Sequence, residues 1–190
     1  FFRITTRGII SGGNLVRRSR AMMSSFNFPR GAVVIGETLK NAIDGIVPAI
    51  VAIVLAILWQ LDQPVHWTVI MVVPVYILAQ FFCLGCSFIV ARACAFVPDL
   101  KSLVSLVNRG LFFLSGVFFS IERFVNHPTL ELLMKLNPVH QFLTAVRVSV
   151  LDGTVPTSFT WLYTAAWSFG LTVLGFLYFW AAEGRYATLR

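Results

Sequence analysis

Four long apolar runs constrain this sequence more than any other feature. A helix needs roughly 20 mostly apolar residues to cross the hydrocarbon core of a bilayer. The runs that reach about this length are residues 42–61, 67–91, 103–121 and 159–182. Only 12% of the residues are charged, which is about half the share of a soluble domain. We therefore predict an all-α, polytopic membrane protein.

The basic residues indicate which side of the membrane each connection faces. Residues 17–40 hold four arginines and one lysine, whereas residues 60–66 hold neither. The positive-inside rule thus predicts that residues 17–40 and the next loop, 92–102, are cytoplasmic, and that residues 122–158 lie outside. The formal net charge of +7 is then explained by the basic residues that orient the chain in the membrane. We expect no nucleic-acid partner, because the basic residues punctuate apolar runs and form no solvated stripe.

A shorter apolar stretch precedes the basic segment. Residues 1–16 contain Arg3 and Arg7 and are short for a complete span. We expect them to be the remnant of an earlier span, in a chain that is incomplete at its N-terminus.

The predicted outer segment carries a helical pattern. Residues 129–136 are apolar enough for a short helix that ends at Asn137 and Pro138. From Val139 onward, apolar residues recur at steps of three and four. Apolar runs of this length are typical of interfacial or re-entrant helices. We expect two half-helices that dip into or cap the outer leaflet.

The sequence has none of the common nucleotide-binding or hydrolytic motifs. It contains no phosphate-binding Gly-x-x-x-x-Gly-Lys-Ser/Thr loop, no Gly-x-Ser-x-Gly and no His-Glu-x-x-His. We expect a chain with no catalytic residue, metal or cofactor of its own. Cys83 and Cys86 share a helix face but lack a second ligand pair, so close helix packing is the favoured interpretation. Gly8 and Gly12 form a similar small-residue pattern.

Two charged residues fall inside the apolar runs. Asp44 and Arg109 are expensive in lipid, and such residues often face protein or a wet path. Both can also snorkel to the inner interface. As a hypothesis, Arg109 lines a translocation path. The phenylalanine pairs at 112–113 and 118–119 could stack against sugar rings, although lipid contact is favoured.

Short motifs occur in a fixed order along this topology. They are Phe28-Pro29-Arg30, Phe82-Cys-Leu-Gly85, Phe96-Val-Pro-Asp99-Leu100, Leu114-Ser-Gly-Val117, Leu136-Asn-Pro138 and Glu183-Gly-Arg-Tyr-Ala187. In this order the chain resembles the ABC-2 type exporter permeases, most closely the polysaccharide and teichoic acid exporters, over essentially its whole length. One departure is Pro98 before Asp99, where such permeases commonly have arginine.

The resemblance implies which partner supplies the energy for transport and which segment contacts it. Such permeases have six spans after an amphipathic helix, so this chain would begin inside the second span. Phe26, Phe28, Pro29 and Arg30 would form a coupling helix that rests on a separate ATP-binding cassette subunit. Two copies of that subunit would hold ATP and Mg²⁺. Aromatic anchors and a forked guanidinium suit such docking, and the alternative is a basic stretch attracted to anionic lipid.

The resemblance also implies a substrate and a path. The chain would homodimerise and export a lipid-linked polysaccharide, such as O-antigen or teichoic acid, across the bacterial cytoplasmic membrane. Arg92 and Asp99 would belong to the cytoplasmic loop. The residues of the path and its outer gate would be Arg109, Asn137, Pro138 and Arg147. The alternatives are an ABC-2 permease for drugs or small lipids and a secondary transporter, which should show an internal repeat.

Overall fold

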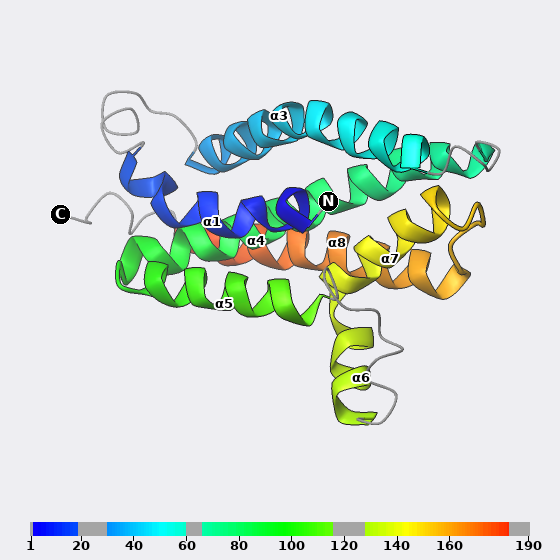
Figure 1. The fold of residues 1–190 in the computed structure, drawn as a ribbon. Coiled ribbons are helices and arrows are strands. Elements are labelled where there is room, and N and C mark those ends of the chain that lie inside the picture. Colours follow the sequence, from blue (N-terminus) through cyan, green and yellow to red (C-terminus); the bar gives the residue numbers. More distant parts are fainter. Residues whose placement is uncertain (1, 19–29, 60–65, 116–127, 183–190) are drawn as a thin grey trace.

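The structure is a computed structural model that describes residues 2–18, 30–59, 66–115 and 128–182 (Figure 1). All regular structure in these ranges is helical, which confirms the predicted all-α membrane fold. In chain order the elements are α1 (Phe2–Arg18), α3 (Arg30–Trp59), the 3₁₀ helix η1 (Trp67–Met71), α4 (Val72–Phe96), α5 (Leu100–Leu114), α6 (Pro128–Leu136), α7 (Pro138–Val150) and α8 (Ser158–Trp180).

Three helical stretches in the described ranges are long and apolar enough to cross a membrane. They are Arg30–Trp59, Trp67–Phe96 and Ser158–Trp180. They overlap three of the four predicted runs. The remaining run, 103–121, is described only as far as α5 and the turn after it. Its last residues, 116–121, lie outside the described part of the chain, so that span stays a prediction.

The helix α3 begins earlier than the apolar pattern indicated. It starts at Arg30, so residues 30–40 of the expected cytoplasmic segment continue the span helix. Val34 and Thr38 are buried on this extension, and Val34 packs in a core cluster with Phe88 and Phe179. Tertiary packing therefore extends the helix beyond the run that hydropathy alone marks.

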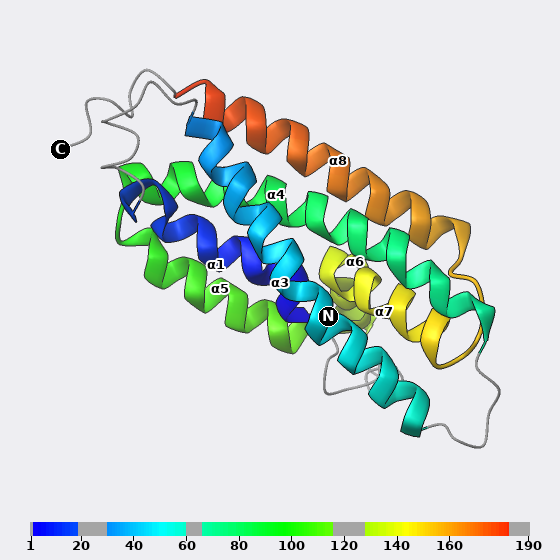
Figure 2. The ribbon, with the colours of Figure 1, turned by 90° about the horizontal axis from the view of Figure 1, so that it is seen from above.

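The helix α4 lies at the centre, between α1 and α8 (Figure 2). Gly85 and Gly175 set the spacing of α4 and α8: a Cβ atom on Gly175 would lie 2.5 Å from the carbonyl oxygen of Gly85. Ser168 and Thr172 on α8 also donate hydrogen bonds to α4 carbonyls, at 2.8 and 2.7 Å. Small residues allow such close approach in membrane bundles.

The contact between α1 and α4 is also made by glycines and by side chains that donate hydrogen bonds to backbone carbonyls. A Cβ atom on Gly8 would lie 2.4 Å from the Cys83 carbonyl oxygen, and one on Gly12 would lie 2.9 Å from that of Ser87. The Cys83 thiol donates to the Thr5 carbonyl at 2.9 Å, and the Ser87 hydroxyl donates to the Gly8 carbonyl at 2.9 Å. The predicted packing role of Gly8, Gly12 and Cys83 is confirmed.

The two ends of the bundle differ in what they collect (Figures 1 and 2). The end of α1, the start of α3, the α4–α5 connection and the end of α8 lie at one end, which we call the inner end. The helix α7, η1 and the start of α8 lie at the opposite, outer end. The helix α6 projects away from the bundle. These names follow the orientation that the basic residues predict.

Candidate functional site

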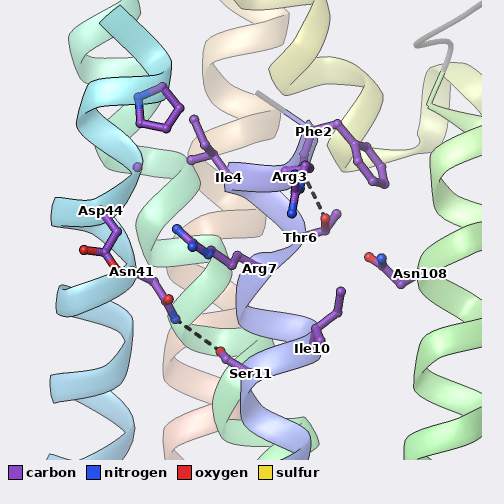
Figure 3. Close-up of a pocket in the computed structure, with 12 residues that line it drawn as sticks. Phe2, Arg3, Ile4, Thr6, Arg7, Ile10, Ser11, Asn41, Asp44 and Asn108 are labelled. Atoms are coloured by element: carbon purple, nitrogen blue, oxygen red, sulfur yellow. Dashed lines mark hydrogen bonds between the residues drawn. The ribbon is translucent and has the colours of Figure 1, made fainter.

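A cleft of about 520 Å³ opens between α1, α3 and α5 (Figure 3). Arg3, Arg7 and Ser11 follow one another at four-residue steps, so they share one face of α1. An adjacent face, about 100° around α1, carries Gly8 and Gly12, which pack against α4. Asn41 and Asp44 line the cleft from α3, and Asn108 lines it from α5. The cleft therefore gathers polar groups from three separate helices.

Few of these polar groups are paired. The Asn41 side-chain amide donates a hydrogen bond to the Ser11 hydroxyl at 3.3 Å. No hydrogen bond or ion pair joins Arg3, Arg7 or Asp44 to another described residue. The side-chain oxygen of Asn108 is buried without a partner in the described part of the chain. The cleft thus presents two cationic groups and an amide with unused hydrogen-bonding capacity.

A second cavity, of about 500 Å³, adjoins the first. The two cavities share Phe2, Arg3, Ile4 and Pro48 as lining residues. The second cavity is mostly apolar. Its other lining residues are Ala52, Ile53, Ala56, Phe112, Leu143, Val146, Arg147, Val150 and Leu151. The cleft therefore has a polar chamber toward the inner end and an apolar chamber that continues toward α7.

The outer junction, where α6 meets α7 at Asn137, matches the predicted pair of half-helices. The Asn137 side-chain oxygen accepts from the Val139 N–H at 3.0 Å, and Pro138 occupies the first turn of α7. The Gln141 amide donates to the Lys135 carbonyl at 2.7 Å. Asn and Pro together end one helix and start the next.

His140 ties the outer junction to α5. Its Nδ1 donates to the Ser115 carbonyl at 2.9 Å, because a carbonyl oxygen can only accept. Its Nε2 therefore accepts from the Thr144 hydroxyl, at 3.1 Å. Burial lowers the pKa of the His140 imidazole, and the Arg147 guanidinium acts in the same direction, while the bond to Ser115 opposes them. The neutral ring is the form that this network holds.

At the inner end, Arg92 does not lie in the loop where the sequence placed it. It belongs to α4, and its guanidinium carbon lies 3.9 Å from the centroid of the Tyr178 ring. The Arg92 Nη1 donates a hydrogen bond to the Tyr178 carbonyl. Arg92 thus joins α4 to α8. Asp99 is exposed and directly precedes α5, in a connection of Val97, Pro98 and Asp99.

The remaining predicted residues fall in different places. Arg109 is exposed on α5 and lines neither cavity. Its neighbour Asn108 lines the polar chamber. Arg147 is exposed on α7 and lines the apolar chamber. Arg30 begins α3 and is half-buried. The predicted coupling residues Phe26, Phe28 and Pro29 lie outside the described residues.

Sequence reasoning missed the polar chamber. In the sequence, Arg3 and Arg7 indicate a short span, and their four-residue spacing also places both on one helix face. Asn41 lay beside the predicted start of a span and Asn108 beside a more conspicuous arginine. No local pattern indicates that these residues meet.

Comparison with known families now identifies the chain. Residues 16–151 match the family model described as "ABC-2 type transporter". Searches of curated proteins and of solved structures gave no match. The matched range covers most of the chain and reaches from the end of α1 through α7. The chain therefore belongs to the ABC-2 type transporter family, as a multi-pass membrane permease that works with an ATP-binding cassette partner.

Proposed function

We propose that this chain is the permease subunit of an exporter for a lipid-linked polysaccharide, such as O-antigen or teichoic acid. It acts as a homodimer in the bacterial cytoplasmic membrane, with two copies of the ATP-binding cassette subunit. The polysaccharide assignment rests on the ordered motifs described above, and the family membership supports the exporter architecture.

One observation carries the proposal further: the bundle is polarised. The start of α3 and the α4–α5 connection lie at the same end, and α7 runs from the middle of the bundle to the other end (Figure 1). A permease that has no ATPase site of its own needs a surface that contacts the ATPase subunit on the inner side and a gate on the outer side. The polarised bundle supplies a location for each.

The proposed cycle is a rigid-body switch. Nucleotide-driven closure of the two ATPase subunits moves the coupling segment, 26–34, of each permease copy. The helix α3 runs from Arg30 to Trp59 with Pro48 inside it, so a displacement at Arg30 is passed along this one helix toward the outer end. The substrate passes between the two permease copies, and α6 and α7 form the gate at the exit. This chain contributes movement and binding, while hydrolysis takes place on the partner.

A double charge substitution tests the coupling step. Phe28→Asp with Arg30→Glu should abolish co-purification of the ATPase in mild detergent, and export of glycan with it. The matched control is Asp152→Arg, which changes an exposed charge after α7, toward the outer end. It should leave ATPase retention intact. Normal ATPase retention and glycan export by the double variant would show that residues 26–34 do not couple the two subunits.

A further inference from the structure

We propose that α3 consists of two arms joined by a hinge at residues 45–48, and that the outer arm swings about this hinge over the apolar chamber. The inner arm, residues 30–44, stays attached to α1 and α4. The outer arm is residues 49–59. This inference goes beyond the proposed function, because it concerns which part of the permease moves and does not depend on the substrate that is exported.

The first argument is the proline inside α3. Pro48 has no N–H, so it cannot donate the helical hydrogen bond that the Asp44 carbonyl would otherwise accept. Gly45 precedes it by three residues, and a residue without a Cβ atom resists a change of its backbone angles least. Proline is one of the few features that bend a helix sharply. The helix α3 arches over the bundle (Figure 1). We therefore expect α3 to bend most easily at this stretch.

The second argument is that the inner arm is pinned one turn before the proline. The Tyr76 hydroxyl of α4 donates a hydrogen bond to the Ala42 carbonyl. A Cβ atom on Gly45 would lie 2.7 Å from that hydroxyl and 3.7 Å from the Ile4 side chain of α1. Further inward, Val34 is buried in a core cluster. The inner arm is thus held by α4 and α1 up to the point where the hinge begins.

The third argument is the difference in burial between the two arms. The buried residues of α3 are Val34, Thr38, Gly45 and Ala49. From position 50 to Trp59, no residue is buried against the described part of the chain. Seen from above, α3 crosses α4 and α1, and its last turns lie at the edge of the bundle (Figure 2). Because fewer buried contacts hold the outer arm, it moves at a lower cost than the inner arm.

The fourth argument is the space beside the outer arm. The apolar chamber, of about 500 Å³, lies between Ala52 and Ala56 of α3 and Leu143 and Val146 of α7. The two alanines are four residues apart, so they share one helix face. Small residues at this spacing allow helices in a membrane bundle to approach closely. A swing toward α7 would therefore bring two compatible faces into contact. Arg147 also lines the chamber, and its guanidinium has to keep its access to water as the arm closes.

The alternative is that α3 moves as one rigid rod. A movement of the outer end would then displace the inner end as well, and the inner contacts with α1 and α4 would break with it. With a hinge, the outer arm swings while the inner contacts persist. The two cases differ in whether two points on α3 respond alike.

The test is disulfide cross-linking at one point on each arm of the purified exporter complex. The outer pair, Ala56→Cys with Val146→Cys, spans the apolar chamber. The inner pair, Asn41→Cys with Ser11→Cys, replaces two side chains that are hydrogen-bonded at 3.3 Å. Mass spectrometry of proteolytic fragments gives the oxidation rate of each pair, without nucleotide and with ATP and vanadate trapped on the partner subunit.

The hinge predicts different responses at the two points. The outer-pair rate should differ by at least about threefold between the two states, because it follows the population in which the two thiols meet. The inner-pair rate should change by less than about 1.5-fold, since its contact persists. Equal responses of the two pairs would overturn the hinge. A complex that gives this result and still exports glycan would leave the proposed function standing.

A single substitution tests the role of the proline. Pro48→Ala restores the missing N–H, so the difference between states at the outer pair should fall below about 1.5-fold. Val47→Ala, at the exposed neighbouring position, is the matched control and should keep the full difference. An undiminished response in Pro48→Ala would overturn the hinge. The comparison of the two pairs in the unchanged helix remains decisive even when the proline variant does not fold.

Discussion

The outer junction and the cleft treat polar groups in opposite ways. At the junction, three described side chains are paired with backbone: His140 with Ser115, Gln141 with Lys135, and the Asn137 oxygen with Val139. The Asn137 side-chain nitrogen is the exception there, since it is buried without a partner in the described chain. In the cleft, Arg3 and Arg7 have no partner in the described ranges. Paired groups hold a structure, whereas unpaired groups are available for a ligand. The contrast separates a region whose polar side chains are held by hydrogen bonds from one whose arginines are not.

The strongest challenge to this contrast is His140→Leu. The substitution leaves the buried Ser115 carbonyl and the Thr144 hydroxyl without their partner. We expect a loss of about 2 kcal/mol in unfolding free energy, the cost of an unsatisfied buried group. Thermal unfolding in detergent measures it. Thr144→Val, which removes only the Nε2 contact, should cost less, and equal stability of all three proteins would show that the junction is not held by this network.

The pH dependence sharpens the same point. Since burial lowers the pKa of His140 below its ordinary value of about 6.5, the unfolded chain takes up a proton first as pH falls. Stability is therefore fully present above about pH 6.5 and decreases as pH falls toward the folded-state pKa, by at most about 1.4 kcal/mol per pH unit. His140→Gln should have a flatter stability profile in this window. An unchanged profile would mean that His140 does not titrate on unfolding.

The smallest expected effect lies in the cleft. Asn108 has a buried side-chain oxygen without a partner in the described chain, so Asn108→Leu removes an unsatisfied group. We expect unchanged or slightly higher stability, by up to about 1 kcal/mol, in the same unfolding assay. Arg109→Leu, at the exposed neighbour, is the matched control for a change in helix hydrophobicity. A marked loss of stability in Asn108→Leu alone would mean that Asn108 is a structural residue.

The spans and the outer helix break could be predicted because their signals are local. A long apolar run has few alternatives to a membrane helix, and Asn137 with Pro138 carries both a cap and a fixed φ angle. The true start of α3 could not be predicted from hydropathy, since Val34 and Thr38 are held by packing against other helices.

The cleft could not be predicted from local sequence patterns, because its residues come from separate helices. It forms where α1, α3 and α5 come together, and no spacing along the chain relates Arg7 to Asn41 or to Asn108. On α5, a rotation of about 100° per residue decides that Asn108 enters the cleft while Arg109 does not. The sequence drew attention to Arg109, whereas its neighbour Asn108 lines the cleft. The role of Arg109 in a translocation path stays a prediction.

The glycine contacts around α4 have a consequence for how this permease moves. With backbone against backbone at Gly85 and Gly175, and again at Gly8, there is no layer of side chains that could slide or repack. We therefore expect α1, α4 and α8 to move together as one rigid unit. The helix α5, none of whose residues is buried in the described chain, is attached far more loosely. The cleft lies where α3 and α5 meet α1, so a displacement of either helix relative to α1 would change the shape of the cleft.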